Sequence, residues 1–442
     1  MTAGAPRACR REVIVKYPVE VFDSLQLLYA VKGFNDHQIH CLVRFVSAPQ
    51  EATLRRAVAL SLRSFPILAT RYATGPGLPA WESLAEPDLD PAFAATDDEK
   101  AFAAETTVRL DEGVGPQVRV ALLHGRHNAL SVTMNHMIAD GSGFKRYLYF
   151  LCDTYSTLVD DPAFTPSRIS IGDRSPRDVV RSFSPLARVH AMIAGVNRPG
   201  KFSFPLEKEG DVRPFIATRT LDRKKVSKLR DFCKRRGATI NDAALAAYYR
   251  SLARRIGERA WEGLEIPIMV DMRRYAPETE IASLRNLSSM VITQIRQKDG
   301  ERFEETLLKV KTAMDGLKKR RIGLGGFVKL SLVYSVCGER LGSRFLKRAL
   351  ETPLICMTNV GELDSQRLSF KGSPVESAFL CGSIKYKPHF QLALSGFDGT
   401  LTLSSNLYGS SKDRQRIDSF LQEVEGELGL GEATGAANRF QK

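Results

Sequence analysis

The feature that most constrains the fold is a pair of apolar segments that runs directly into an amphipathic one. The segments QVRVALL (117–123) and ALSVTMN (129–135) flank the polar sequence HGRH, a pattern typical of a β-hairpin. Apolar residues then recur at helical spacing over 143–158, which predicts an amphipathic helix. The sequence NHMIADGSG (135–143) therefore lies on a strand-to-helix turn, and the chain is expected to form an α/β fold.

The rest of the chain continues this mixture of strands and helices. Apolar patterns predict strands at 39–46, 266–270 and 286–295, the first of them half-buried, and helices at 54–65, 241–255, 303–317 and 417–428. Gly237 is expected to end one helix, and Asn241 to cap the start of the next. Asp398-Gly399 joins two alternating segments and predicts a second hairpin.

Length indicates two domains, because a chain of 442 residues exceeds the size at which a single hydrophobic core stops growing. Periodicity is weak between 160 and 215, where Pro, Arg, Ser and Gly are frequent, and this indicates a crossover. We assign an N-terminal domain that carries the histidine motif to 1–170 and a crossover linker to 171–215. A C-terminal domain is assigned to 216–430, followed by a frayed tail at 431–442.

Composition places the chain among globular proteins, and charge leaves several partners open. The hydrophobic fraction is 43%, and 64 Lys and Arg against 50 Asp and Glu give a net charge of +14. Such a charge suits nucleic acid, an anionic membrane or a polyanionic cofactor. The basic residues lie in short groups without a nucleic-acid-binding motif, so solvated helix ends are the preferred interpretation and no nucleic-acid partner is expected.

No segment has the length of apolar sequence that a signal peptide or a membrane span requires, so a cytoplasmic protein without a membrane span is expected. The cysteines are scattered, without a C-x-x-C pair or a His-Cys group, and are interpreted as reduced core residues. They are Cys9, Cys41, Cys152, Cys233, Cys337, Cys356 and Cys381. Neither a metal site nor a disulfide framework is expected.

His136 is the candidate for chemistry. Strand alternation places it on the inward face of Leu130, Val132 and Met134. The plain alternative is a core histidine satisfied by backbone carbonyls, with Asp140 as a helix N-cap and Gly141 as a turn residue. A buried neutral imidazole is also the side chain best suited to take a proton at pH 7.

Two further features bear on this histidine. Asp140 is expected to be structural and to pair with Arg273 or Arg274, because a buried carboxylate needs a cation or several donors. A nucleophile motif of the type G-x-S-x-G is absent from the sequence, which favours direct attack by an acceptor on an activated acyl group.

NHMIADG resembles the H-H-x-x-x-D-G signature of the CoA-dependent acyltransferase superfamily, which includes chloramphenicol acetyltransferases, alcohol O-acetyltransferases and condensation domains. The segments FPILATRY, NDAALAAYYRSLARR, MTNVGELD and SGFDGTLTLSSN are similar to other landmarks of that superfamily, in the same order. The likeness runs from about residue 20 to residue 428 and is closest to the alcohol O-acetyltransferases. Asn135 stands where the first histidine of the doubled motif is expected, and the D-F-G-W-G motif of plant members is absent from the sequence.

The resemblance implies two similar α/β domains of the chloramphenicol acetyltransferase type, with a tunnel between them that leads to His136. It implies a monomer that transfers a short acyl group from acyl-CoA, as co-substrate and not as a bound cofactor, to a small alcohol or amine. His136 would be the base and Asp140, Gly141 and Arg273 its support. Thr358, Asn359 and Asn135 would be pocket or oxyanion candidates, with the loop at 357–361 closing over the site.

Two alternatives stay open beside this interpretation. The acyl donor would be bound to an acyl carrier protein in one, as in condensation-type relatives. The other is a catalytically silent protein that binds an acyl ligand or a protein partner, although the presence of both His136 and Asp140 argues against it.

Overall fold

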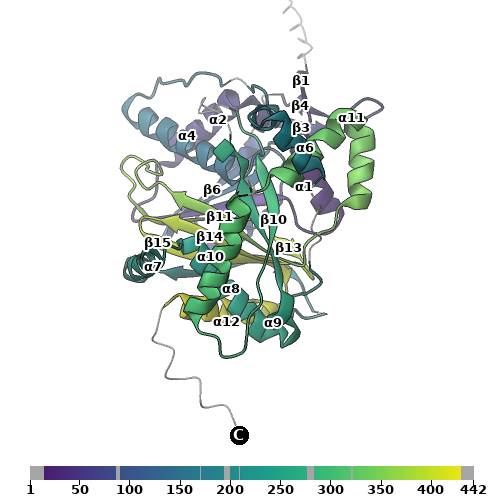
Figure 1. Cartoon of the computed structure of the whole chain (residues 1–442). Helices are drawn as coiled ribbons and strands as arrows, with labels where there is room; N and C mark the ends of the chain where they lie inside the picture. Colours follow the sequence, from purple (N-terminus) through teal and green to yellow (C-terminus); the bar gives the residue numbers. More distant parts are fainter. Residues whose placement is uncertain are drawn as a thin grey trace, which may run out of the picture.

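The structure is a computed structural model that describes residues 14–85, 90–169, 171–193, 200–208, 210–275, 283–319 and 322–429. The helices are α1 (Val21–Val31), α2 (Glu51–Ser64), α3 (Glu99–Glu105), α4 (Gly141–Asp160), α5 (Arg177–Arg181), α6 (Pro185–Ile193), α7 (Arg223–Arg235), α8 (Ile240–Ile256), α9 (Arg259–Gly263), α10 (Phe303–Lys319), α11 (Leu324–Ala349) and α12 (Ser411–Leu428). The strands are β1 (Lys16–Pro18), β2 (Gln38–Phe45), β3 (Thr70–Ala73), β4 (Ala80–Ser83), β5 (Phe93–Thr96), β6 (Val118–Leu123), β7 (Asn128–Asn135), β8 (Arg213–Leu221), β9 (Glu265–Asp271), β10 (Ser288–Gln294), β11 (Ile355–Leu363), β12 (Val375–Cys381), β13 (Lys385–Tyr386), β14 (Phe390–Phe397) and β15 (Thr400–Gly409). The predicted α/β fold is confirmed (Figure 1).

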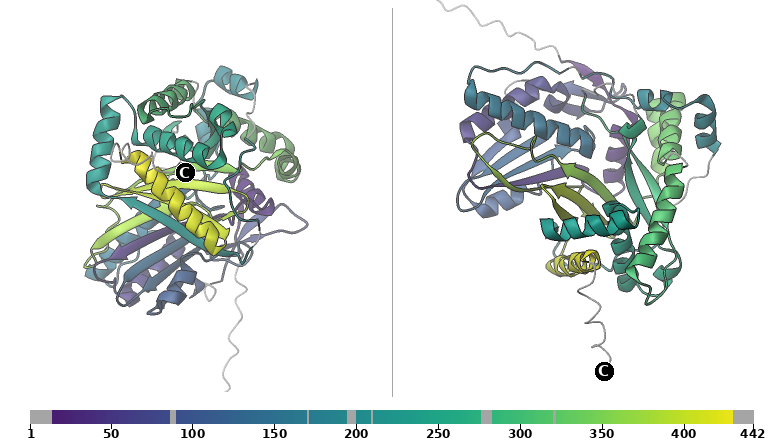
Figure 2. Two further views of the ribbon diagram at one scale, coloured as in Figure 1. Left: turned by 90° about the horizontal axis from the view of Figure 1, so that it is seen from below. Right: turned by 60° about the vertical axis from the view of Figure 1, so that its left-hand side comes forward.

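The first sheet carries the strand that ends at the histidine motif. Its strand order is β12-β2-β7-β6-β5, and the predicted hairpin is present as β6 and β7, with Val118 opposite Met134. The helices α2 and α4 pack together and lie over this sheet (Figure 2). The turn after β7 therefore opens at the edge of a two-layer lobe.

The second sheet is built from the later part of the chain. Its order is β10-β9-β11-β14-β15-β13, and β8 pairs with β15. The predicted Asp398-Gly399 hairpin joins β14 to β15, and both turn residues have positive φ, 47° and 77°, as a type I′ turn requires. A small third sheet, β1-β4-β3, lies at the N-terminal end of the described chain.

The two lobes exchange elements. β12 comes from the second half of the chain but pairs with β2, with Ala378 opposite Val43. Conversely, Val21 and Phe22 of α1 belong to the core of the second lobe. The segment expected to be a linker, 171–215, contains α5, α6 and the first residues of β8, and the tail expected at 431–442 lies outside the described residues.

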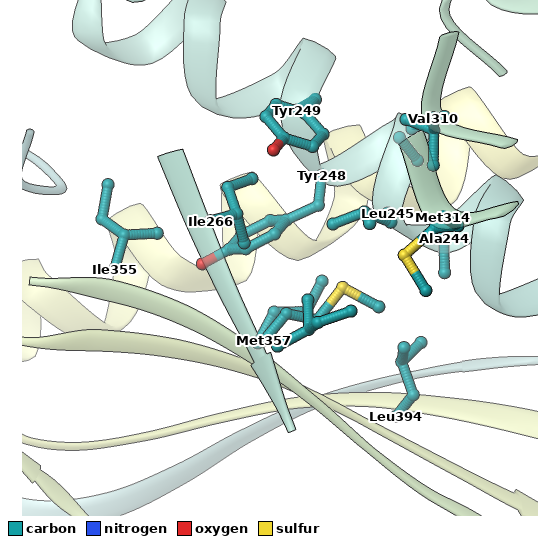
Figure 3. Close-up of a cluster of buried hydrophobic side chains, with 14 of the residues drawn as sticks. Ala244, Leu245, Tyr248, Tyr249, Ile266, Val310, Met314, Ile355, Met357 and Leu394 are labelled. Carbon is teal, nitrogen blue, oxygen red and sulfur yellow. The ribbon is translucent and has the colours of Figure 1, made fainter. Parts of the chain in front are cut away.

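The core of the second lobe lies between its sheet and the helices α8 and α10 (Figure 3). Tyr248 and Tyr249 of α8 are both fully buried, so their hydroxyls need partners. Tyr248 Oη donates to the carbonyl oxygen of Cys356 at 3.2 Å, and Tyr249 Oη lies 2.9 Å from Thr293 Oγ1. These bonds fix α8 against β11 and β10, the strands that reach the histidine motif.

Two local predictions were wrong, and one helix was not predicted. β2 is not half-buried, since Phe102 of α3 covers part of its outer face. Thr239, not Asn241, caps α8, because its side chain accepts from the Asp242 amide while the Asp242 carboxylate accepts from the Thr239 amide. The long helix α11 was missed, because its glycines lower helix propensity and Gly338 breaks it with a φ of 67°.

Some basic residues and one cysteine lie in surroundings that differ from those the sequence predicted. The basic pair at the end of α8 is not simply solvated, since Arg254 and Arg255 form ion pairs with Glu427 and Glu423 of α12 at 2.6 and 2.5 Å. Of the cysteines that the structure describes, Cys337 is exposed and the others are buried. Among the described residues no single helix is long and apolar enough to span a membrane, although α10 and α11 pass together by length and composition across a 43° bend.

Candidate active site

His136 follows β7 directly and begins the turn that leads into α4. Its amide donates to the carbonyl oxygen of His37 at 2.8 Å, which holds the turn against the segment before β2. The residue is half-buried, whereas Met137 and Ile138 beside it are fully buried. His136 is therefore the more exposed residue of this turn, at the end of a rigid strand.

Asn286, just before β10, fixes the orientation of the imidazole. Its Nδ2 donates to the carbonyl oxygens of His136 and Met137, at 2.8 and 3.0 Å. Because carbonyl oxygens only accept hydrogen bonds, the NH2 group of Asn286 must be the end that faces them. Its Oδ1 then faces His136 Nδ1, 3.2 Å away. Nδ1 must then carry the proton of the neutral ring, so that Nε2 holds the lone pair.

We expect Asn286→Ala to lower kcat about 10-fold, the worth of roughly one well-made hydrogen bond, because the ring loses the acceptor that selects its tautomer. The KM for an acyl donor should change much less, because Asn286 contacts the base and its backbone. Steady-state kinetics on the folded variant measure both. An unchanged kcat would show that the bond between Asn286 and His136 does not orient the base.

Burial lowers the pKa of His136 below its ordinary value, and the positive charge of Lys385 acts in the same direction. The carbonyl oxygens of His136 and Ala139 and the charge of Asp140 oppose this shift of the pKa without cancelling it. The imidazole is consequently neutral at pH 7, the form that can accept a proton.

Asp140 lies one turn of chain beyond the histidine and caps α4. Its Oδ1 accepts from the Gly143 amide at 3.0 Å, and its Oδ2 accepts from Arg273 Nη1 and from the Leu287 amide, each at 2.7 Å. Burial alone would raise the pKa of Asp140, but the Arg273 charge and these hydrogen bonds together hold it below its ordinary value. Arg273 is thus the candidate arginine that the structure brings to Asp140, while Arg274 lies over the Tyr275 ring.

Two buried arginines from outside the motif hold the same turn. Arg174 makes a two-pronged ion pair with Asp23, at 2.7 and 2.9 Å, and donates to the carbonyl oxygens of Met137 and Ile138. Arg285 pairs with Asp178 of α5 at 2.5 Å, and its own carbonyl oxygen accepts from Arg273 Nη2 at 2.9 Å. The backbone around His136 is therefore fixed by side chains from both lobes and from the crossover between them.

The two glycines of the motif meet different surroundings. A Cβ on Gly143 would lie 2.8 Å from the Ala139 Cβ and 3.4 Å from the Arg285 carbonyl oxygen. A Cβ on Gly141 would lie 3.4 Å from Val360 Cγ1, an ordinary contact with a side chain that can adjust. Gly143 is thus the position where the turn tolerates no side chain.

Gly143→Ala is therefore expected to destabilise the fold by about 1–3 kcal/mol, the usual cost of overpacking. Gly141→Ala, as its matched control, should change the free energy of unfolding by less than about 1 kcal/mol, because its Cβ meets no backbone atom. Urea denaturation of both variants separates them. Equal effects would contradict the close approach of Gly143 to Ala139.

The side chain of Asn135 is engaged by hydrogen bonds within the turn, and its role as a pocket candidate stays a prediction. The residue is fully buried, its Nδ2 donates to Gln117 Oε1 at 2.7 Å, and its Oδ1 accepts from the Met137 amide at 2.9 Å. These bonds occupy its amide group in bracing the turn. Asn135 therefore supports the backbone beneath His136.

The segment 357–361 forms part of strand β11 and not the expected loop. It runs parallel to β14, with an irregularity between Asn359 and Glu362, and Lys145 of α4 donates to the Val360 carbonyl oxygen at 3.0 Å. Asn359 is exposed, and its Nδ2 donates to Asn241 Oδ1 at 3.1 Å, while Thr358 is half-buried. β11 thus covers the start of α4 as an extended strand, and the oxyanion roles of Thr358 and Asn359 stay predictions.

Lys385 is the charged residue near the base that sequence reasoning missed. The side chain is 3% exposed, and its Nζ lies 3.8 Å from the centre of the Phe34 ring. Burial lowers the pKa of Lys385 and raises that of the neighbouring Asp36 to about 6. A lysine in the two-residue strand β13 carries no pattern that marks it in the sequence.

Metal ligands do not gather in the described residues: no group of three or more His, Cys, Asp and Glu side chains there could hold an ion. The absence of a metal requirement stays a prediction.

Solved structures of low sequence identity share this fold. Polyketide synthase associated protein 5 from Mycobacterium tuberculosis has a TM-score of 0.61 at 15% identity, over 91% of this chain and 97% of that chain. A trichothecene 15-O-acetyltransferase from Fusarium sporotrichioides has a TM-score of 0.68 at 12% identity, over 94% and 95%. The first condensation domain of the calcium-dependent antibiotic synthetase has a TM-score of 0.66 at 16% identity, over 94% and 97%.

No family model matches the sequence, and no curated protein does. The two-lobed fold that these solved structures share is the one implied by the resemblance of NHMIADG to the CoA-dependent acyltransferase signature, so the predicted fold is confirmed.

Proposed function

We propose that this protein transfers an acyl group from a thioester to the hydroxyl, or the amine, of a small acceptor, with His136 as general base. The observation that carries the proposal is the geometry of the ring. Asn286 Oδ1 lies 3.2 Å from Nδ1, so the neutral imidazole has its lone pair on Nε2.

In the proposed reaction, Nε2 removes the proton of the acceptor as the acceptor oxygen or nitrogen attacks the thioester carbonyl carbon. The tetrahedral intermediate then collapses, the carbon–sulfur bond breaks, and the imidazolium returns the proton to the departing thiolate. Each step needs one base with a pKa near neutrality and no covalent enzyme intermediate. The low pKa of His136 favours its return to the neutral form between turnovers.

Acyl-CoA is the donor that we propose, and an acylated carrier protein is the alternative. One neighbour in fold is an acetyltransferase and another is a condensation domain, so the fold accommodates both kinds of relative. The net charge of +14 suits the phosphates of CoA. A silent acyl-binding protein is disfavoured, because such a protein would not need a base held in one tautomer.

A donor screen tests the proposal. Thiol release is followed from acyl-CoAs of increasing chain length, each with and without a panel of alcohols and amines. Acceptor-dependent release from at least one short acyl-CoA is expected. Transfer only from an acylated carrier protein would show that the carrier protein, and not CoA, presents the acyl group. No transfer from either kind of donor would refute the proposed function.

The pH dependence of that activity tests the electrostatics of the base. Because the working form of His136 is neutral and its pKa is lowered, the acid limb of the kcat/KM profile should lie below about pH 6.5, the ordinary value. Lys385→Met removes a positive charge that disfavours the imidazolium, so the pKa of His136 rises and the limb moves to higher pH. Lys412→Met is the control, since that lysine is 73% exposed. An acid limb that stays in place in Lys385→Met would show that Lys385 does not act on the base.

A further inference from the structure

The helices α6 and α11 lie against each other at one end of the molecule and leave large apolar side chains in solvent (Figure 1, Figure 2). On α6, Leu186, Val189 and Ile193 are 83%, 55% and 79% exposed. Their spacing of three and four residues places them on one face of the helix. α6 therefore presents an apolar stripe outward.

The helix α11 also exposes apolar side chains, on both sides of its break at Gly338. Leu332 and Val336 are 42% and 74% exposed, and Leu341 and Phe345 are 61% and 60% exposed. Each pair is four residues apart, so each shares a face of its helical segment. Together with the three of α6, these side chains make up seven of the fifteen large apolar residues that are exposed in the described part of the chain. Exposed apolar side chains are thus frequent on these two adjacent helices, and we call their solvent-facing side the α6–α11 face.

The α6–α11 face belongs to helices that are firmly docked on their other side. Phe327 of α11 stacks on Phe22 of α1, with ring centres 4.8 Å apart, and Ala191 of α6 is 6% exposed within the core. The helices thus have one apolar side that the core covers and a second one that it does not. A second apolar side of this kind marks a contact surface.

Charge on α11 indicates what that surface contacts. Its basic residues are Lys329, Arg340, Arg344, Lys347 and Arg348, against the single carboxylate of Glu339. Burial raises the pKa of Glu339 to about 7, which further weakens the negative charge. The partner should therefore be both apolar and anionic. A second copy of this chain does not fit, because a two-fold contact would set these cations against themselves.

We propose that the α6–α11 face docks on an anionic membrane surface. Its apolar side chains enter the headgroup region, and the exposed Arg344, Lys347 and Arg348 meet lipid phosphates, as in an interfacial amphipathic helix. α10, which precedes α11, packs Leu307, Val310 and Met314 into the core, so α11 lies along the surface and does not cross it. The inference goes beyond the proposed acyl transfer and needs no activity measurement.

Vesicle co-sedimentation of the full chain tests the proposal. Binding is expected to vesicles of phosphatidylcholine with phosphatidylserine, to be much weaker with phosphatidylcholine alone, and to fall as salt is added. Val336→Asp with Phe345→Asp should reduce the bound fraction by roughly tenfold or more, since two inserted side chains are lost. The matched control is Val46→Asp with Val212→Asp, at residues 69% and 49% exposed elsewhere on the surface, and it should bind like the unchanged protein.

Cys337 gives a second measurement, because it is exposed and lies on α11 between the two apolar pairs. In a Cys9→Ser background, an environment-sensitive dye on Cys337 should shift its emission toward the blue when anionic vesicles are added. No sedimentation with anionic vesicles, or equal binding of the two double variants, would overturn the proposal. It would also be overturned by light scattering that shows a dimer which the Val336 and Phe345 changes dissociate, or by binding only to an acidic protein.

Discussion

Replacing His136 by alanine is expected to lower the turnover number by about 10²–10⁴ fold, the usual contribution of a positioned general base. The loss follows from geometry: Asn286 and the turn after β7 hold Nε2 in one place, and no other imidazole takes its position in the described part of the chain. Donor binding should persist, since the CoA portion of the donor would lie away from the ring. Steady-state rates and calorimetric titration of donor measure the two effects separately.

The control for His136→Ala is His127→Ala, which makes the same chemical change at a surface residue 56% exposed. If His136 is instead a structural histidine, its replacement will lower the free energy of unfolding, donor binding and turnover together. Near wild-type turnover in a folded His136→Ala protein would end the catalytic assignment.

The local architecture of the motif was readable from the sequence because its determinants lie close together in the chain. Alternation in 129–135 predicts β7, helical spacing in 143–158 predicts α4, and the turn between them fixes where His136 must lie. The pairing of Asp140 followed from a general requirement, that a buried carboxylate needs a cation, together with an arginine at the end of a buried strand.

The residues that complete the site were not readable, because no local pattern tells which distant residues they contact. Asn286 begins the predicted strand at 286–295, but strand alternation does not indicate that its side chain reaches His136, and Arg174 lies in a crossover segment that looked like a linker. Lys385 belongs to a strand of two residues. Each is placed by tertiary contacts that join distant parts of the chain, so periodicity and capping rules carry no signal for them.

The same limit explains the errors in the fold. β12 pairs with β2, more than three hundred residues earlier in the chain, and the sequence of β12 alone does not indicate which strand it pairs with. β11 continues through MTNVG, where Gly361 has a φ of 76° and produces an irregularity that resembles a loop in sequence. In both cases long-range strand pairing overrides the local preference.

The second large effect is expected at the ion pair between Asp140 and Arg273, which stabilises the turn. Asp140 is 2% exposed and accepts hydrogen bonds from four groups. Since its pKa is lower in the folded than in the unfolded chain, ionised Asp140 stabilises the fold above the unfolded value of about 3.9. That contribution is lost as the pH falls through the folded pKa. Asp140→Asn should therefore flatten the acid side of the stability profile.

Asp140→Ala is expected to lower the free energy of unfolding at pH 7 by about 3–5 kcal/mol, because it leaves the amides of Gly143 and Leu287 without their acceptor and the half-buried Arg273 guanidinium with only Asp271, 3.3 Å away. Asp98→Ala is the matched control: Asp98 also caps a helix, α3, but at an exposed site, so its loss should cost only about 1 kcal/mol. A cycle with Arg273→Ala isolates the pair, and the double variant should be less destabilised than the sum of the single variants. If Asp140→Ala abolishes turnover while urea denaturation shows unchanged stability, Asp140 acts on the substrate and its structural assignment is wrong.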